Sequence, residues 1–232
     1  MIGIITYDTP HRKTQDLVTQ LILNGYSEIH LIVIPWVERK CFQPIFIHRP
    51  AKCVNINIEA FADRLKLSYS KVDINSLNDF FSKKAFSHIL IAGAGLLPKE
   101  LALNYKIINS HPGYLPNVKG LDALKWAIYQ GQPIGVTTHY ISDKADEGVL
   151  IERRIIPIFF EDTFYSLAYR VYETEIEMLV NSIKLVDNNQ FANEPLDDNR
   201  YVANKRMPHH LEIIMINRFE EIRKKSSSHR VE

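Results

Sequence analysis

The sequence has few of the features that mark a secreted, metal-binding or membrane-spanning protein. It holds two cysteines, Cys41 and Cys53, and it has neither a CxxC motif nor the Cys and His spacing of a zinc site. We therefore expect two reduced thiols and no bound metal. No apolar run approaches the roughly 18 residues of a membrane helix, and the apolar segment after Met1 lacks the basic stretch of a leader. These absences predict a cytoplasmic protein with no membrane partner.

The chain also lacks an excess of charge of either sign. Its 28 basic and 27 acidic residues give a formal net charge of +1. Proteins that bind nucleic acids usually carry a basic patch or a strongly basic balance, so we expect no nucleic acid partner. With 46% hydrophobic residues in a chain of 232, the sequence can bury a full core as one large domain, with or without a small appendage.

Strand and helix patterns alternate through the first half of the chain. Ile2–Tyr7 and Ile29–Ile34 are unbroken apolar runs, as expected for strands covered on both faces. Between them, "DTP" predicts a helix start, with Asp8 or Thr9 as N-cap and Pro10 as the first helical residue. Further strands are expected near residues 68–72, 87–92 and 107–110, and further helices near 58–67 and 76–84. This rhythm favours an α/β fold with a Rossmann-like, mainly parallel sheet, in which ligands bind at the carboxyl ends of the strands. Residues 35–56 show no clear pattern.

The second half of the chain changes character. The strands expected at 134–141 and 148–158 are joined by "SDKADE", which is too short for a helical crossover, so they form an antiparallel addition to the sheet. Asp162 is expected to cap a long helix. We divide the chain into an α/β domain, residues 1–186, and a small C-terminal extension, residues 187–232, made of a polar loop, an amphipathic helix near 209–223 and a disordered tail.

Three polar residues carry the predicted chemistry. Asn109 and His111 stand in "INSHPGYLP" at the end of a buried strand, and Asp146 lies in the strand link "ADEG". If the two loops meet, an amide and a protonated imidazole would stabilise an oxyanion while the carboxylate moves a proton. This suits acyl-type transfer without a covalent intermediate. Taken singly, each residue is more typical of a structural role, such as turn formation.

The elements "ILIAGAGLLPKE", "INSHPGYLP", "KGLDALKWAI" and "GVTTHYISDKADEGVLI" together resemble the formyltransferase family that uses 10-formyltetrahydrofolate. The resemblance is close over residues 85–186 and implies that Asn109, His111 and Asp146 are the catalytic trio of a formyltransferase domain. It also implies that His139 supports the loop of Asp146 and that the Leu115–Pro116 bond is cis. The folate would contact one stretch after a strand and one loop, namely Ala92, Gly93, Ala94, Gly95, Leu96 and Leu97, and Ile141, Ser142, Asp143 and Lys144.

Comparison with the branches of this family indicates the acceptor. The glycinamide ribonucleotide branch has a glycine-rich phosphate loop after its first strand, where this sequence reads "TYDTPHRKT". The initiator-tRNA branch has a C-terminal barrel that the 46 residues after position 186 are too few to form, and the formyl-folate hydrolases have an extra N-terminal domain. The sequence is most similar to the short sugar N-formyltransferases, which act on nucleotide-linked 4-amino-4,6-dideoxy sugars, such as dTDP-linked ones, for O-antigen and lipopolysaccharide synthesis.

This resemblance implies a nucleotide-sugar site and a homodimer. The candidate sugar-nucleotide contacts are Tyr114, Lys119, Trp126 and Tyr201, because an aromatic ring can stack on a base and a lysine can meet a pyrophosphate. Trp126 in a core and Lys119 in a solvated turn are the competing interpretations. The stripe of the last helix, with Leu211, Ile214 and Phe219, can form the dimer or pack on its own domain.

Three other functions stay open at this point. They are a glycinamide ribonucleotide formyltransferase, a formyl-folate hydrolase that uses the same trio on water, and a non-catalytic nucleotide-binding domain of the same fold.

Overall fold

The computed structural model describes residues 1–38, 42–50 and 52–227. Cys41 and the last part of the tail lie outside the described residues, and Cys53 is a free, partly exposed cysteine. The described strands are β1 (Ile2–Tyr7), β2 (Ile29–Ile34), β3 (Ser68–Lys71), β4 (His88–Ile91), β5 (Ile107–His111), β6 (Gly135–Ile141), β7 (Gly148–Ile155) and β8 (Glu194–Pro195). The helices are α1 (Arg12–Leu23), α2 (Ile58–Arg64), the 3-10 turn η1 (Ile74–Ser76), α3 (Leu77–Ser82), α4 (Lys99–Asn104), α5 (Ala123–Gln130), α6 (Phe164–Asp187) and α7 (His209–Lys224).

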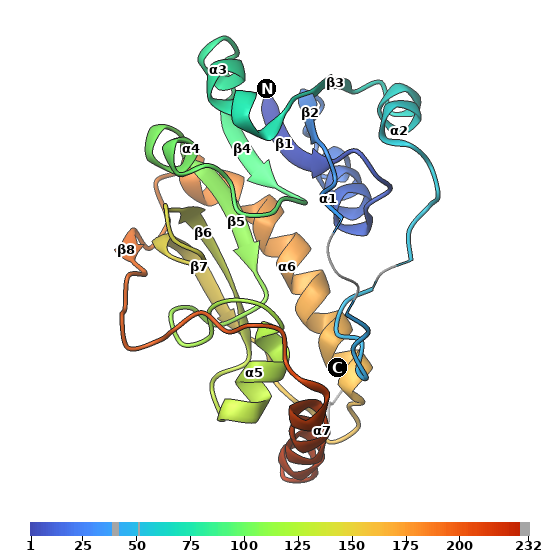
Figure 1. The fold of residues 1–232 in the computed structure, drawn as a ribbon, viewed down its shortest axis with the longest axis vertical. Coiled ribbons are helices and arrows are strands. Elements are labelled where there is room, and N and C mark those ends of the chain that lie inside the picture. The colour runs from blue at the N-terminus through green and yellow to red at the C-terminus, as the bar shows by residue number, and fades with distance from the viewer. Residues whose placement is uncertain (39–41, 51, 228–232) are drawn as a thin grey trace.

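All eight strands form one sheet in the order β3-β2-β1-β4-β5-β6-β7-β8 (Figure 1). The pairs from β3 to β5 are parallel, and β5-β6, β6-β7 and β7-β8 are antiparallel. This confirms the predicted α/β class, with a mainly parallel sheet and an antiparallel addition. The strand order reverses between β1 and β4, which gives the sheet a switch point where the carboxyl ends of two neighbouring strands open a crevice.

Each face of the sheet is covered by its own core. Because side chains alternate along a strand, Ile4 of β1 packs with α1 and α6 while Ile5 packs with α3 and α4 on the other face. In Figure 1 the long helix α6 runs diagonally from near β5 down toward α7. Its first half joins α5 and α7 in a third cluster, which closes the lower end of the molecule.

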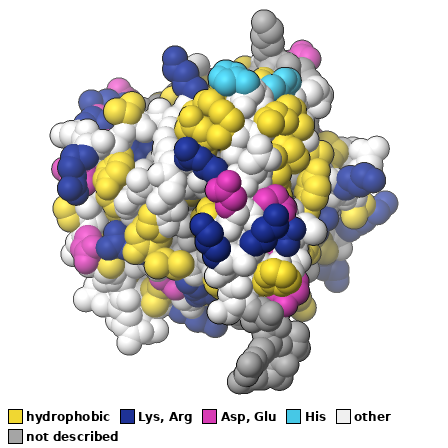
Figure 2. All heavy atoms as spheres, turned by 90° about the horizontal axis from the view of Figure 1, so that it is seen from below, with side chains coloured by type: hydrophobic (Ala, Val, Ile, Leu, Met, Phe, Trp, Pro, Cys, Tyr) yellow, Lys and Arg dark blue, Asp and Glu magenta, His cyan; other side chains and the backbone are white. Residues whose placement is uncertain are grey.

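The last helix, α7, packs mainly on its own chain. Phe219 and Met215 are fully buried against α5 and α6, and Leu211 is half-buried in the same cluster. Ile214 is 42% exposed. On the face seen from below in Figure 2, apolar side chains form small groups separated by charged ones. Of the three residues predicted for a dimer contact, Leu211, Ile214 and Phe219, only Ile214 is therefore exposed. The homodimer stays a prediction.

Two predicted helix starts were wrong. Helix α1 begins at Arg12 with His11 as N-cap, because the Asp8 carboxylate instead accepts the backbone N–H of Trp36 at 2.8 Å. Helix α6 is capped by Thr163 in a capping box with Ser166, while the carboxylate of Asp162 binds Arg170 at 2.6 Å. In both places an acidic side chain near the helix start has a partner other than the first turn.

Two further observations bear on the predictions. The Leu115–Pro116 peptide bond is cis, as the resemblance implied. Among residues 1–38, 42–50 and 52–227, none of the helices combines the length and the apolar character needed to cross a membrane.

Candidate active site

A cavity of about 1140 Å³ opens at the switch point of the sheet. Tyr7 at the end of β1, Ala92 after β4 and His111 at the end of β5 all line it. A pocket for one small molecule usually measures roughly 300–1,000 Å³, so this cavity has room for a donor and an acceptor together.

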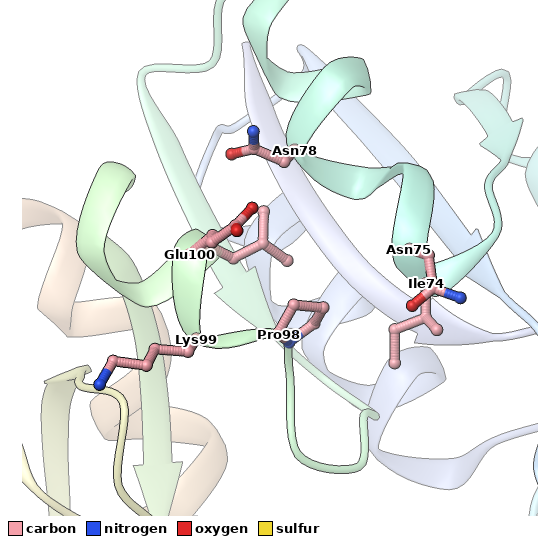
Figure 3. A pocket seen from close by; sticks show the side chains of 7 residues that line it. Ile74, Asn75, Asn78, Pro98, Lys99 and Glu100 are labelled. Atoms are coloured by element: carbon pink, nitrogen blue, oxygen red, sulfur yellow. The ribbon is translucent and has the colours of Figure 1, made fainter.

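A smaller cavity of about 280 Å³ lies between η1, α3 and α4. Figure 3 shows that Lys99 extends away from Ile74 and Asn78, and its ammonium pairs with Asp143 at 2.7 Å instead. This cavity contains none of the predicted site residues.

The predicted trio converges on the larger cavity. His111 Nδ1 lies 3.2 Å from Asp146 Oδ1, and His111 Nε2 lies 2.9 Å from the carbonyl oxygen of Val118. Only an imidazole that is protonated on both nitrogens can donate to both oxygens. Asp146 Oδ2 accepts the backbone N–H of Gly120 at 2.6 Å, so both carboxylate oxygens are held.

Local backbone geometry explains how these residues meet. Asn109 and His111 are two residues apart on β5 and therefore face the same side of the sheet. Asp146 has a φ of +54°, a left-handed conformation that costs free energy for a residue with a Cβ and that is enriched at functional sites. A Cβ added to Gly113 would lie 2.6 Å from His111 Nε2 and 2.7 Å from Val118 O. Glycine at this position thus lets the Val118 carbonyl reach the imidazole.

His139 positions two parts of the site. Its ring is buried, and burial, together with the nearby His111, lowers its pKa to about 4, so it is neutral at pH 7. Its Nδ1 lies 3.1 Å from the Glu147 carbonyl oxygen and donates to it, which holds the loop of Asp146. Its Nε2 is then a lone-pair acceptor 3.4 Å from the Asn109 amide nitrogen. The loop support was predicted, whereas the orientation of the Asn109 amide was not.

The residues predicted for the folate share one wall of the cavity, which we call the donor wall (Ala92–Leu97 and Ile141–Lys144). All ten of these residues line the cavity. Leu96 is 80% exposed, and the ion pair between Lys99 and Asp143 joins the two stretches. Apolar side chains can pack on a flat ring, and the backbone N–H and C=O groups beside them can bind its polar edges. These residues therefore fit the predicted formyl donor.

The four side chains predicted for the nucleotide sugar lie outside the lining of this cavity. Lys119 is 2% exposed, and its ammonium is held by Glu147 at 2.9 Å, so it cannot meet a pyrophosphate. The Trp126 indole donates to the Lys205 carbonyl oxygen at 2.8 Å. The Tyr201 hydroxyl accepts from the Asn117 amide at 3.2 Å, and Tyr114 lies under the Arg153 guanidinium. Each of these polar groups binds another part of the chain.

Sequence reasoning missed the opposite wall of the cavity, which we call the acceptor wall. It is formed by loops together with helices α1, α5 and α6, and its residues are His11, Lys13, Pro44, Ile47, His48, Arg49, Gly120, Leu121, Asp122, Ala123, Glu175, Ala203, Asn204, Lys205 and Arg206. In Figure 1 the segment around residue 48 and the stretch before α7 lie below the end of β5, whereas the connection after β4 lies above it. The segment 35–56 had no periodic pattern, so no signal pointed to its residues.

A buried ion pair links this wall to the trio. Lys13 Nζ lies 2.6 Å from Glu175 Oε1 and 3.3 Å from the carbonyl oxygen of Ser110. Burial raises the pKa of Glu175, but Arg49 and Lys13 outweigh it, so the pKa is lowered overall and the group is a carboxylate at neutral pH. Within the described part of the chain, no group of three or more His, Cys, Asp or Glu side chains could hold a metal ion.

Residues 76–183 match the family model described as formyl transferase. Among curated relatives, the chain is 28% identical over 196 residues to the methionyl-tRNA formyltransferase of Leptospira interrogans. This alignment covers 82% of the chain and 60% of the relative, so the chain spans about three fifths of the length of that relative.

Two solved structures share the fold. The N-formyltransferase of Helicobacter canadensis, in complex with folinic acid and dTDP-3-aminofucose, is 15% identical with a TM-score of 0.63, and the match covers 99% of this chain and 83% of that one. The phosphoribosylglycinamide formyltransferase of Anaplasma phagocytophilum is 22% identical with a TM-score of 0.59, and the match covers 81% and 86%. These two likenesses show that the chain has the fold of these structures.

Proposed function

We propose that this chain, whose residues 76–183 belong to the formyl transferase family, transfers a formyl group from 10-formyltetrahydrofolate to the 4-amino group of a nucleotide-linked 4-amino-4,6-dideoxy sugar. The observation that carries this proposal is the meeting of Asn109, His111 and Asp146 in one cavity with room for two substrates. We further propose a dTDP-linked acceptor and a role in the synthesis of surface polysaccharides such as the O-antigen of lipopolysaccharide.

Asn109 and His111 would stabilise the oxygen of the formyl group as negative charge develops on it. One N–H of the Asn109 amide faces His139, which leaves the second free to donate to that oxygen. The imidazolium of His111 places a positive charge on the same face of β5. Fixed donors and charges of this kind lower a barrier because they need no rearrangement when the reaction occurs.

Asp146 would take the proton that the attacking amine loses. Its carboxylate lies beside the imidazolium and is fixed by the Gly120 N–H, so its remaining lone pairs point to a limited region of the cavity. No covalent intermediate with the protein would be needed, because the amine would attack the formyl carbon directly. The bond between that carbon and the folate nitrogen would then break, and tetrahydrofolate would leave with the proton that Asp146 took from the amine. The donor would be held by the donor wall, and the chemistry it supplies is an activated formyl group.

Support for an amino-sugar acceptor comes from the comparisons. The structure of the Helicobacter canadensis protein holds folinic acid and dTDP-3-aminofucose together, and its match extends over 99% of this chain. The cavity of this chain is also large enough for a donor and a nucleotide-linked acceptor.

An acceptor panel tests the proposal. The purified protein is incubated with 10-formyltetrahydrofolate alone, and with a dTDP-linked 4-amino-4,6-dideoxy sugar, glycinamide ribonucleotide or methionyl-tRNA, and tetrahydrofolate release is followed together with the mass of the acceptor. We expect release and a mass gain of one formyl group with the amino sugar. Release without any acceptor would make the protein a formyl-folate hydrolase, release with another acceptor would reassign its substrate, and no release would leave a binding domain.

A further inference from the structure

Three buried polar atoms of the described residues lack a hydrogen-bond partner. They are His48 Nδ1, Ser110 Oγ and Glu175 Oε2, and all three residues line the large cavity. Buried polar groups nearly always have a partner, so three such atoms around one cavity indicate a site that binds a polar ligand.

Two guanidinium groups on the acceptor wall are only partly neutralised. Arg49 Nη2 lies 3.6 Å from Glu175 Oε2, and Arg206 Nη1 lies 3.4 Å from Asp122 Oδ1. The two arginine side chains are 45% and 47% exposed, whereas the two carboxylates are 1% and 2% exposed. Each arginine thus rests on a buried anchor and keeps most of its donors for a ligand.

His48 lies close to both arginines. Its Nε2 is 3.6 Å from Asp122 Oδ1, the carboxylate that also anchors Arg206. Burial, together with the positive charges of Arg49, Lys125 and Arg206, lowers the pKa of His48 to about 3. Arg49 follows His48 directly in the chain, and His48 and Arg206 both approach Asp122 Oδ1, so the two guanidinium groups lie around the same part of the cavity.

Buried contacts hold both loops in place. Asp122 Oδ2 accepts the backbone N–H of Met207 at 2.9 Å, next to Arg206. Glu212, which is fully buried with Lys125, accepts the backbone N–H of Ile45 at 2.6 Å. The arginines are thus carried by preorganised loops, which lowers the entropic cost of binding a ligand.

We propose that Arg49 and Arg206, with His48 between them, form the subsite for the phosphate groups of the acceptor, a nucleoside diphosphate. This inference rests on the proposed function, because it assigns a part of the acceptor to the acceptor wall. The planar fork of an arginine matches two phosphate oxygens at once. The cations of this wall are Lys13, Arg49, Lys205 and Arg206 and its carboxylates are Asp122 and Glu175, so the formal charge is 4 − 2 = +2. Lys13 is buried against Glu175, which leaves the arginines as the better phosphate ligands.

Titration calorimetry with dTDP tests this subsite in the full chain. We expect Arg49→Gln and Arg206→Gln each to weaken dTDP binding about tenfold or more, the effect typical of losing a charged hydrogen bond. Thymidine, which has no phosphate, should bind equally weakly to all variants, and binding of 10-formyltetrahydrofolate should stay unchanged. Dissociation constants for dTDP that match the wild type in both variants would overturn the proposal.

Arg154→Gln is the matched control. Arg154 is 38% exposed and pairs with Glu177 at 2.8 Å, but it lies on β7 outside the cavity lining. We expect it to bind dTDP like the wild type. If it weakens binding as much as the other two variants, the effect is one of general surface charge and the subsite is refuted. Melting temperatures of all three variants verify that they are folded.

Failure of this subsite can be separated from failure of the proposed function. If the amino sugar is formylated but its KM is unchanged in Arg49→Gln and Arg206→Gln, the reaction stands and the subsite is wrong. If no amino sugar is formylated but the arginines are needed to bind dTDP or glycinamide ribonucleotide, the phosphate subsite stands for another acceptor. If neither nucleotide binds the wild type, the subsite is wrong.

Discussion

The two walls of the cavity are built in different ways. The donor wall is formed by two short stretches, Ala92–Leu97 and Ile141–Lys144, which directly follow strands of the sheet. The acceptor wall is assembled from loops and helices that are far apart in the sequence, and buried ion pairs join them, such as Lys13 of α1 with Glu175 of α6, 162 residues away. Positions at strand ends follow from backbone pairing, whereas positions on the acceptor wall depend on side-chain contacts that form only in the folded chain.

The largest expected effect concerns the residues between the walls. We predict that Asn109→Ala and Asp146→Ala each lower kcat at least about a hundredfold, because removing one oxyanion donor typically raises a barrier by about 2.7–4 kcal/mol. Steady-state formyl transfer, with circular dichroism to verify the fold, measures this effect. Wild-type turnover in either folded variant would refute the catalytic assignment.

The acceptor wall is expected to be destabilised when the buried ion pair of Lys125 and Glu212, which holds the loop of Ile45, loses one partner. Lys125 and Glu212 are both fully buried and paired, so Lys125→Met leaves an isolated carboxylate in the core. We expect the free energy of unfolding to fall by about 3–5 kcal/mol in urea denaturation. The double variant Lys125→Met/Glu212→Gln should recover part of this loss. A single variant as stable as the wild type would contradict the structural role of the pair.

Acid is expected to weaken the acceptor wall and the support that His139 gives to the loop of Asp146. The pKa of His11 and of His139 is lowered to about 4 and that of His48 to about 3, in each case first of all by burial. Between pH 6.5 and about 4 the unfolded chain binds protons that the folded chain does not, so the free energy of unfolding decreases as the pH falls. Each histidine contributes up to about 1.4 kcal/mol per pH unit in this window.

Denaturation at pH 7 and pH 5 measures this pH dependence. We expect His48→Gln to have a shallower loss of stability than the wild type, because one buried proton acceptor is removed. His210→Gln, at an exposed position of α7, should keep the slope of the wild type. Equal slopes in all three proteins would show that His48 does not contribute.

The smallest effect is expected for the donor wall's own ion pair. Lys99 and Asp143 are 65% and 31% exposed, so their pairing at 2.7 Å is screened by water. We expect Lys99→Gln to leave the melting temperature unchanged and to alter the KM for 10-formyltetrahydrofolate by less than about fivefold. The difference in melting temperature between this variant and Lys125→Met measures how much more a buried ion pair stabilises its wall than an exposed one. A melting temperature lowered as much as in Lys125→Met would remove the distinction.

The sheet and the trio could be predicted because their signals are local. The apolar run Ile29–Ile34 is a strand with every residue buried, as its composition indicates. Asn109 and His111 are brought to one face by the two-residue period of β5, and Asp146 lies in the link between β6 and β7, which pair as a hairpin. Backbone pairing at the sheet thus decides most of the site.

The residues of the acceptor wall could not be predicted because their signals are not local. Lys119 stands in the motif "KGLDALKWAI", but its ammonium is buried against Glu147, and the residue is outside the lining of the cavity. Arg49 stands in a segment without periodic pattern, and its neighbour Glu175 was predicted only as part of a long helix. A residue type shows that a charge is present, but not which buried partner will hold it.

The amino-acid sequence by itself determined the α/β sheet, the strand end at which Asn109 and His111 stand and the resemblance to the formyltransferases, because periodicity and short motifs act over a few residues. The tertiary structure decided which loops face one another across the cavity. It buried Lys119, left Arg49 and Arg206 half-exposed, and placed His139 against the Asn109 amide. These outcomes depend on the balance between desolvation and long-range pairing of charges, which is settled only when the whole core has packed.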